Sequence, residues 1–300
     1  DELPARMVVI GGGVIAAEFS HVFSAFGTEV TQLNRSSRLL RGVDEEVVAR
    51  FEEAASKQWN IVKEASLAEI RENADGSVTV VAKRASENGE ELLEIPADAV
   101  LVATGRRPNT DTLNAKNYFD VQDGGQLSVD KYQRVLYNGA PVPGVYALGD
   151  VSSRYQLKHV ANHEARVVQH NLSHPEDLRA SDHRYVPGAV FSNPQIAVVG
   201  MTEEQAREAA EREGFEITVK AQNFGDTAYG WAMEDKIGLC KLIARKDNGE
   251  LLGAHLVGEE SSVLIQPLLQ AMSFGMDART LARGQYWIHP ALTEIIENAL

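Results

Sequence analysis

A chain of 300 residues is long enough to form two domains, each with its own hydrophobic core. Its formal net charge of −14 argues against a nucleic-acid partner, since binding phosphates needs clustered lysine and arginine. The single cysteine, Cys240, excludes an internal disulfide framework and favours a reducing, cytoplasmic compartment. No signal peptide is visible, and no apolar run approaches the roughly 18 residues of a membrane span, so no membrane partner is expected.

The first fifty residues predict a βαβ unit. An apolar strand over residues 7–10 runs into three glycines and a helix over 14–26, and a second strand follows over 29–33. The periodicity of the helix predicts an inward face made of Ile15, Phe19, Val22, Phe23 and Phe26. A charged, amphipathic helix is expected next, over residues 45–59.

A dinucleotide fingerprint, Gly11-x-Gly13-x-x-Ala16, lies between the first strand and the helix. Gly11 permits the tight turn, Gly13 lets the backbone approach a pyrophosphate, and Ala16 allows close packing of helix on strand. The helix N-terminus supplies N–H donors to the phosphates. A tight strand–helix turn without a ligand is the alternative, but the position after a strand and before a helix favours a nucleotide site.

The end of the second strand indicates which nucleotide is bound. An NAD site would place Asp or Glu there to bind the ribose 2′-hydroxyl, whereas this chain carries Arg35, Arg38 and Arg41. Guanidinium groups bind phosphate through charge-assisted and often bidentate hydrogen bonds. The arginines could instead be solvated surface charges, but their location favours NADPH.

The rest of the chain shows two further changes in its pattern of predicted strands and helices. Strands with a turn at Asp75-Gly76 are expected over residues 61–81, and a buried strand over 98–103 precedes Gly105. A second strand signal covers residues 145–150, and an α+β pattern begins at Tyr185. Its expected strands cover 189–191, 196–200, 217–223, 238–244 and 251–257, and its expected helices 202–213, 261–274 and 290–300.

The C-terminus holds the strongest catalytic candidates, His289 and Glu294. Pro290 suits the first position of a helix, which would leave His289 at the cap. Because helical side chains tilt toward the N-terminus, Glu294 is expected to reach His289 and fix its tautomer. Out of context, such a His-Pro pair is usually a plain helix cap. The remaining histidines lack accompanying ligands, and we assign no metal site.

Four segments, in order, resemble the pyridine-nucleotide disulfide oxidoreductases, which are flavoproteins with two dinucleotide sites. These segments read GGGVIAAE, ATGRRPN, YALGDV and HPALTEIIE. The likeness covers essentially the whole chain. The stretches VSSRYQLKHVANHEARVVQHN and GQYWIHPALTEIIENAL are most similar to the mycothione reductases of this family.

The resemblance implies an α/β fold with three parts. A Rossmann-like NADPH-binding domain would cover residues 1–105, the rear part of an FAD-binding domain 106–183, and an α+β dimerisation domain 184–300. It places Glu18 near the nicotinamide, paired with a lysine of the flavin domain. Val14 departs from the aromatic gate found in glutathione reductase. The cofactor contacts that we expect are Gly11, Gly13, Val14, Ile15, Ala16, Glu18, Arg35, Arg38, Arg41 and Gly105 for NADPH, and Gly149, Asp150, Lys158 and His159 for FAD.

The same resemblance implies a homodimer that reduces a low-molecular-weight disulfide, with mycothione as the expected substrate and His289 and Glu294 protonating the departing thiolate. The family passes electrons through a pair of cysteines, but Cys240 lies in an apolar strand and is expected to be inert packing. That pair and the first FAD-binding unit would lie before Asp1, so these 300 residues alone are expected to be inactive. The alternatives are a glutathione or other disulfide reductase of the same family, and a non-catalytic NADPH-binding dimerisation module.

Overall fold

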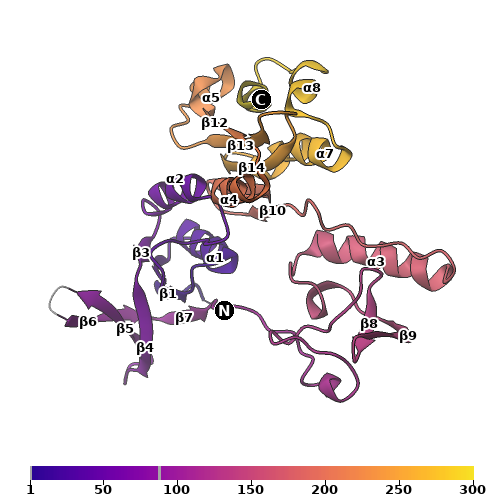
Figure 1. The fold of residues 1–300 in the computed structure, drawn as a ribbon. Helices are drawn as coiled ribbons and strands as arrows, with labels where there is room; N and C mark the ends of the chain where they lie inside the picture. Colours follow the sequence, from indigo (N-terminus) through magenta and orange to yellow (C-terminus); the bar gives the residue numbers. More distant parts are fainter. Residues whose placement is uncertain (1, 87–88) are drawn as a thin grey trace. The chain divides into compact units, whose positions relative to one another are not determined.

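The computed structural model describes residues 2–86 and 89–300, which fall into two compact units (Figure 1). The first unit comprises Asp1–Gly105 together with Pro187–Leu300, and the second comprises Arg106–Val186. None of the described helices combines the length and the apolar composition needed to cross a bilayer. The assignment of residues 1–105, 106–183 and 184–300 to three functional domains stays a prediction.

A parallel four-stranded sheet forms the N-terminal part of the first unit, in the order β3-β2-β1-β7. Its strands are β1 (Arg6–Ile10), β2 (Glu29–Leu33), β3 (Asn60–Val62) and β7 (Ala99–Val102). The helices α1 (Val14–Ala25) and α2 (Glu45–Ala55) cover one face. This is the expected βαβ arrangement, and it brings the carboxyl ends of β1 and β2 to the same edge of the sheet.

The opposite face of this sheet is covered by an antiparallel meander of β4 (Ala65–Glu72), β5 (Val78–Ser86) and β6 (Gly89–Ala97). Val8, Ile10 and Leu33 of the parallel sheet pack there against Ala65 and Val80. The parallel strands are therefore apolar on both faces, which is typical of sheets covered on two sides. The sequence reasoning placed no strand at β6.

The C-terminal part of the first unit contains an antiparallel sheet in the order β10-β11-β14-β13-β12. Its strands are β10 (Gly188–Val190), β11 (Gln195–Gly200), β12 (Ile217–Asn223), β13 (Leu239–Arg245) and β14 (Leu251–Gly258). The helices of this part are α4 (Glu203–Glu213), α5 (Ala228–Ala232), α6 (Ser261–Leu264), α7 (Gln266–Phe274), α8 (Ala278–Arg283) and α9 (Glu294–Ala299).

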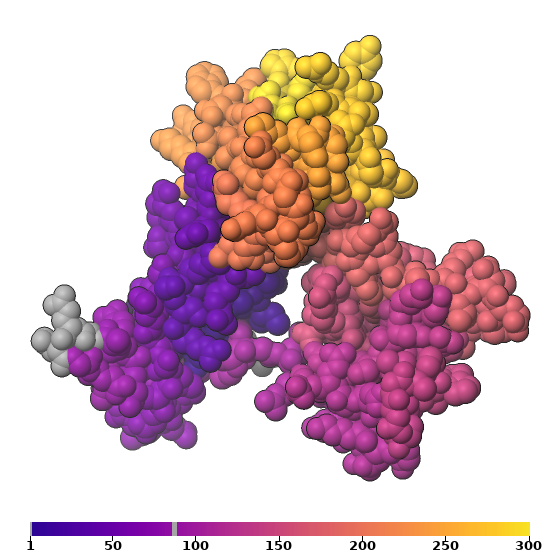
Figure 2. Space-filling model, viewed as in Figure 1, coloured from indigo at the N-terminus to yellow at the C-terminus, as the bar shows by residue number. Residues whose placement is uncertain are grey.

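One hydrophobic cluster joins the two parts of the first unit. Val9 and Phe51 of the N-terminal part belong to the same buried cluster as Ile196, Leu239 and Val257 of the C-terminal sheet. Figure 1 shows α1 and α2 between the two sheets, and Figure 2 shows the orange surface around α4 against the indigo surface of the N-terminal part. Side chains from residues far apart in sequence therefore meet in a shared interior.

The second unit is built around the helix α3 (Lys158–Ser173). A two-stranded sheet of β8 (Arg134–Tyr137) and β9 (Ala140–Tyr146) lies in the same unit, with short 3₁₀ turns η1 (Ala115–Asn117) and η2 (Gly149–Val151). Its small core contains Ala115, Leu127, Val135 and Ala147. The sequence reasoning did not identify α3 as a helix.

The predicted inward face of α1 is wrong. Ile15, Phe19, Val22 and Phe26 are exposed, and Phe23 is only partly buried; the buried positions are Ala16, Ala17 and Ser20. Small side chains occupy the contact because the helix lies close to the strands behind the glycine turn. The expected helix over 261–274 is likewise divided into α6 and α7 around Ile265.

Candidate functional site

The glycine turn between β1 and α1 has the geometry that a phosphate-binding loop needs. Gly11 has a φ of +145°, and a Cβ there would lie 2.4 Å from the Ala103 carbonyl oxygen, so glycine is required. Gly13 precedes α1 as its cap, and among the described residues no atom outside its two chain neighbours lies within 4 Å of the place where its Cβ would be. The N-terminus of the 12-residue helix α1 thus faces open space with its first amides available to an anion.

Residues outside the fingerprint hold this turn in place. The side-chain amide of the fully buried Gln32 donates to the Gly11 carbonyl oxygen at 3.0 Å and accepts from the Trp59 indole N–H at 2.9 Å. The Leu40 amide donates to the Gly12 carbonyl oxygen at 2.7 Å. Sequence reasoning missed Gln32, although a glutamine inside an apolar strand is a signal that its amide has buried partners.

The arginine loop, residues 34–43, joins β2 to α2 and carries the three predicted phosphate ligands. Arg35 and Arg41 are exposed, and Arg38 is half-buried with its guanidinium donating to the Arg41 carbonyl oxygen at 3.2 Å. The Asn34 side chain donates to the Ser36 and Arg38 carbonyl oxygens, both at 2.9 Å. Arg38 and Arg41 line a depression of about 700 Å³, so two of the three arginines border one surface.

The remaining predicted nucleotide contacts lie on α1 and after β7. Val14 and Ile15 are exposed in the first turn of α1, while Ala16 is fully buried below the glycine turn. Glu18 is half-buried and accepts a hydrogen bond from the Phe191 amide at 2.9 Å. Gly105, with a φ of +145°, is exposed at the end of the N-terminal part.

In the second unit, Gly149 and Asp150 form the turn η2. Gly149 has a φ of +68°, and its amide donates at 2.6 Å to Glu164, a carboxylate that is 1% exposed. His183 Nε2 lies 3.0 Å from the other oxygen of Glu164. Asp150 faces Arg106 at 3.4 Å. Sequence reasoning missed Glu164, whose signal is a carboxylate on the buried stripe of α3.

Lys158 and His159 open α3 and are both exposed. The Lys158 ammonium donates to the Asn162 side chain at 2.5 Å, within the first turn. The predicted flavin-side residues therefore lie in two neighbouring places of the same unit, the η2 turn and the start of α3.

His289 and Glu294 form the predicted pair. The Nδ1 atom of His289 lies 2.6 Å from Glu294 Oε1, and the side chains are 66% and 17% exposed. A carboxylate only accepts, so Nδ1 carries the proton and Nε2 is the acceptor of the neutral ring. The hydrogen bond from His289 lowers the pKa of Glu294 and keeps it ionised.

The local structure of this pair differs from the prediction. Pro290 does not begin a helix, because α9 starts at Glu294, and the Ala291 amide donates to Glu294 Oε2 at 3.3 Å. Glu294 therefore reaches back across a turn rather than along a helix. His289 and Pro290 line a depression of about 660 Å³ whose other lining residues include Asp226, Tyr229 and Trp231.

Cys240 does not carry redox chemistry. It lies in β13, fully buried, and burial raises the pKa of its thiol to about 12. A thiolate is the reactive form of cysteine, so this side chain is unreactive at neutral pH. The structure bears out its assignment as inert packing.

Comparisons with known proteins agree with these features. A family model described as "Pyridine nucleotide-disulphide oxidoreductase" matches residues 1–165, and a second, described as the dimerisation domain of the same group, matches residues 186–300. The two matches together cover nearly the whole chain.

Curated relatives match over most or all of the chain. Mycothione reductase of Mycobacterium tuberculosis is 51% identical over 304 residues, covering 100% of this chain and 62% of its own length. Dihydrolipoyl dehydrogenase of Synechocystis is 33% identical, with coverage of 100% and 62%, and mercuric reductase of Staphylococcus aureus is 34% identical, with 93% and 49%. The chain thus spans less than two thirds of the length of these relatives.

Solved structures show the same architecture. The HOCl-induced flavoprotein disulfide reductase RclA of Escherichia coli superposes with a TM-score of 0.84 at 29% identity, covering 99% of this chain and 65% of that one. A Cu(II) complex of the same protein also gives a TM-score of 0.84, with coverage of 99% and 64%.

Proposed function

The chain belongs to the pyridine nucleotide-disulphide oxidoreductase family, and we propose that it is the NADPH-binding, flavin-contacting and dimer-forming portion of a reductase for a low-molecular-weight disulfide. The 51% identity to a mycothione reductase across the whole chain carries the proposal and favours mycothione as the substrate. The portion contributes nucleotide binding and the acid–base pair, while the redox thiols belong to residues other than these 300, because Cys240 is buried.

The glycine turn and the arginine loop fit NADPH. The space at Gly13 admits a pyrophosphate to the N-terminus of α1, and Arg35, Arg38 and Arg41 follow the end of β2, where a 2′-phosphate would lie. No carboxylate occupies that strand end, where an NADH site would place one. These residues bind and orient the nucleotide so that its nicotinamide end lies toward Glu18.

The turn η2 and the start of α3 fit one edge of FAD. Asp150 presents a carboxylate that suits a hydroxyl group of the flavin nucleotide, and the buried Glu164 accepts a hydrogen bond from the amide of the preceding Gly149. A bound flavin supplies the capacity to accept a hydride from NADPH. The chain's own residues position that group and supply no electrons themselves.

His289 and Glu294 suit proton transfer to a departing thiolate. With Nδ1 fixed by Glu294, the ring exchanges a proton through Nε2, and its exposure leaves it accessible to a disulfide substrate. The depression beside His289 gives that substrate a place to bind. We propose that this pair acts as the general acid in the homodimer, in which it would serve the active site of the partner subunit.

Nucleotide titration of the chain tests the cofactor. We expect NADPH to bind at least about ten-fold more tightly than NADH, which corresponds to one charge-assisted contact. Arg35→Ala and Arg41→Ala should lose this preference, whereas Arg50→Ala on α2, outside the loop, should keep it. Equal affinity for the two nucleotides in the unaltered chain would contradict the use of NADPH.

Turnover by the intact protein tests the substrate. We expect mycothione to be reduced with a higher kcat/KM than glutathione disulfide. Reduction of glutathione disulfide alone would refute mycothione and leave the disulfide reductase class in place.

A further inference from the structure

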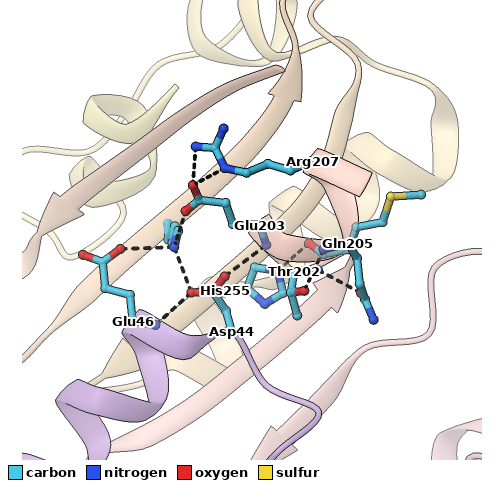
Figure 3. Close-up of polar contacts among 9 residues, drawn as sticks. Asp44, Glu46, Thr202, Glu203, Gln205, Arg207 and His255 are labelled. Atoms are coloured by element: carbon cyan, nitrogen blue, oxygen red, sulfur yellow. Dashed lines mark hydrogen bonds and ion pairs between the residues drawn. The ribbon is translucent and has the colours of Figure 1, made fainter. Parts of the chain in front are cut away.

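A buried charge cluster lies where the arginine loop meets the C-terminal sheet. The ammonium of Lys241, on β13, lies 2.9 Å from Asp44, 3.2 Å from Glu46 and 2.7 Å from Glu203. The side chains of Lys241 and Asp44 are 5% and 2% exposed. We call these four residues the carboxylate–lysine cluster. Figure 3 shows Asp44 and Glu46 facing Glu203 of α4.

Asp44 binds two helix N-termini at once. Its Oδ1 accepts from the Glu46 amide of α2 at 3.2 Å, and its Oδ2 accepts from the Glu203 amide of α4 at 3.1 Å. Lys241 donates to the same carboxylate, so one buried group ties α2, α4 and β13 together. A buried carboxylate of this kind is held firmly, because losing a partner would leave charge unpaired in the interior.

Asp44 directly follows the arginine loop, as the N-cap residue of α2. Arg41 precedes it by three residues, and Arg38 and Arg41 line the same depression as all four members of the carboxylate–lysine cluster. The loop is fixed further back through the Leu39 amide, which donates to Glu52 at 2.7 Å. The chain after Arg41 is therefore also anchored, through Asp44, to the C-terminal part.

The charges of the cluster matter as well as its contacts. Asp44, Glu46 and Glu203 are three of the seven acidic residues that line this depression together with Arg38 and Arg41, two arginines that must remain free to bind a phosphate. Lys241 compensates one of these negative charges, and Arg207 pairs with Glu203 on its outer side. The nearby His255 ring is buried, which lowers its pKa and keeps it neutral, so Lys241 is the buried cation at this place. Without it, the carboxylates would attract the arginines and repel the phosphate.

We propose that Lys241 is a positioning residue for nucleotide choice: through Asp44 it fixes the end of the arginine loop and keeps Arg38 and Arg41 directed at the 2′-phosphate. The inference rests on the proposed use of NADPH. It assigns to the C-terminal part a role in cofactor selection, in addition to the role in dimerisation. NADH lacks the 2′-phosphate, so its binding depends on the glycine turn and not on this anchor.

Binding measurements on the 300-residue chain test the proposal. In Lys241→Met, we expect the affinity for NADPH and for 2′,5′-ADP to fall about ten-fold, which corresponds to losing one charge-assisted contact between the arginine loop and the 2′-phosphate. The affinities for NADH and 5′-ADP should change by less than about two-fold. Lys220→Met is the matched control, because Lys220 is exposed on the neighbouring strand β12, and it should bind all four nucleotides as the unaltered chain does.

A second variant covers the risk that Lys241→Met does not fold. Asp44→Asn combined with Lys241→Met removes both buried charges and keeps an oxygen that accepts from one of the two helix amides. It should fold and lose the preference for NADPH in the same way. An equal loss for phosphorylated and unphosphorylated nucleotides, or no loss, would overturn the role of Lys241. Failure of the unaltered chain to prefer NADPH would instead refute the proposed cofactor.

Discussion

The hydrogen bond between His289 and Glu294 determines which nitrogen of the ring exchanges a proton. With Nδ1 bound to a carboxylate at 2.6 Å, only Nε2 is left to act on a substrate. His289→Gln should therefore lower the turnover of the disulfide by about 10²- to 10⁴-fold, the range for a lost general acid. Steady-state kinetics of the intact protein measures this loss.

Glu294→Gln separates charge from geometry at the same pair. Its amide oxygen can still accept from Nδ1, so we expect a smaller loss, about ten-fold, with NADPH binding unchanged. His174→Gln, an exposed histidine of the second unit, is the control and should retain full turnover. If Glu294→Gln turned over as fast as the unaltered protein, the carboxylate would have no part in the proton transfer.

At the scale of single elements, local periodicity predicts most strands, but it fails where tertiary packing determines which side chains are buried. The apolar spacing of Phe19 and Val22 indicated a buried face of α1, yet the sheet contacts the small side chains of Ala16 and Ala17. Helix α3 escaped detection because its buried stripe includes the polar Glu164 and Asn171, which interrupt the apolar pattern. Their partners are the His183 ring and backbone groups elsewhere in the second unit, which no local pattern reveals.

Asp44, the N-cap residue of α2, contributes to the free energy of unfolding by an amount that depends on pH. Burial by itself raises the pKa of Asp44, but hydrogen bonds from Lys241 and from the Glu203 amide outweigh it and lower the pKa below 3.8. A lowered folded-state pKa contributes stability that is present above the unfolded pKa and is lost as the pH falls through the folded one. Asp44→Asn should therefore be less stable by about 2 kcal/mol at pH 7, a difference that shrinks below about pH 4.

Urea unfolding at several pH values measures this difference. Asp247→Asn is the control, because its carboxylate pairs with Arg245 at an exposed place, 58% accessible, and it should show little change at pH 7. A difference between Asp44→Asn and the unaltered chain that stayed constant from pH 7 to pH 3 would show that the loss comes from packing and not from the charge of Asp44.

At the scale of the whole molecule, the glycine fingerprint, the arginines and the His289–Glu294 pair were all visible in the sequence. The residues that support them were not, because their contacts connect distant positions: Lys241 and Asp44 are 197 residues apart. The sequence also gave no sign that Val9 and Phe51 share a core with Leu239. Such contacts arise from the tertiary fold, so motifs predict reactive groups better than the groups that position them.

The C-terminal part leaves large apolar side chains exposed, which supports the proposed homodimer. Phe274, at the end of α7, is 80% exposed, and Val263, Trp231 and Ile288 are each more than half exposed. Monomeric proteins rarely expose extensive apolar surface, so we expect a species of twice 32.8 kDa by light scattering at concentrations of about 10 μM.

Phe274→Asp should raise the dissociation constant of the dimer at least about ten-fold, because it places a charge in an apolar contact. Leu92→Asp, at a side chain 61% exposed on β6, is the control and should leave the dimer intact. A mass of one chain at every concentration, or equal dissociation by both substitutions, would contradict a dimer formed through α7.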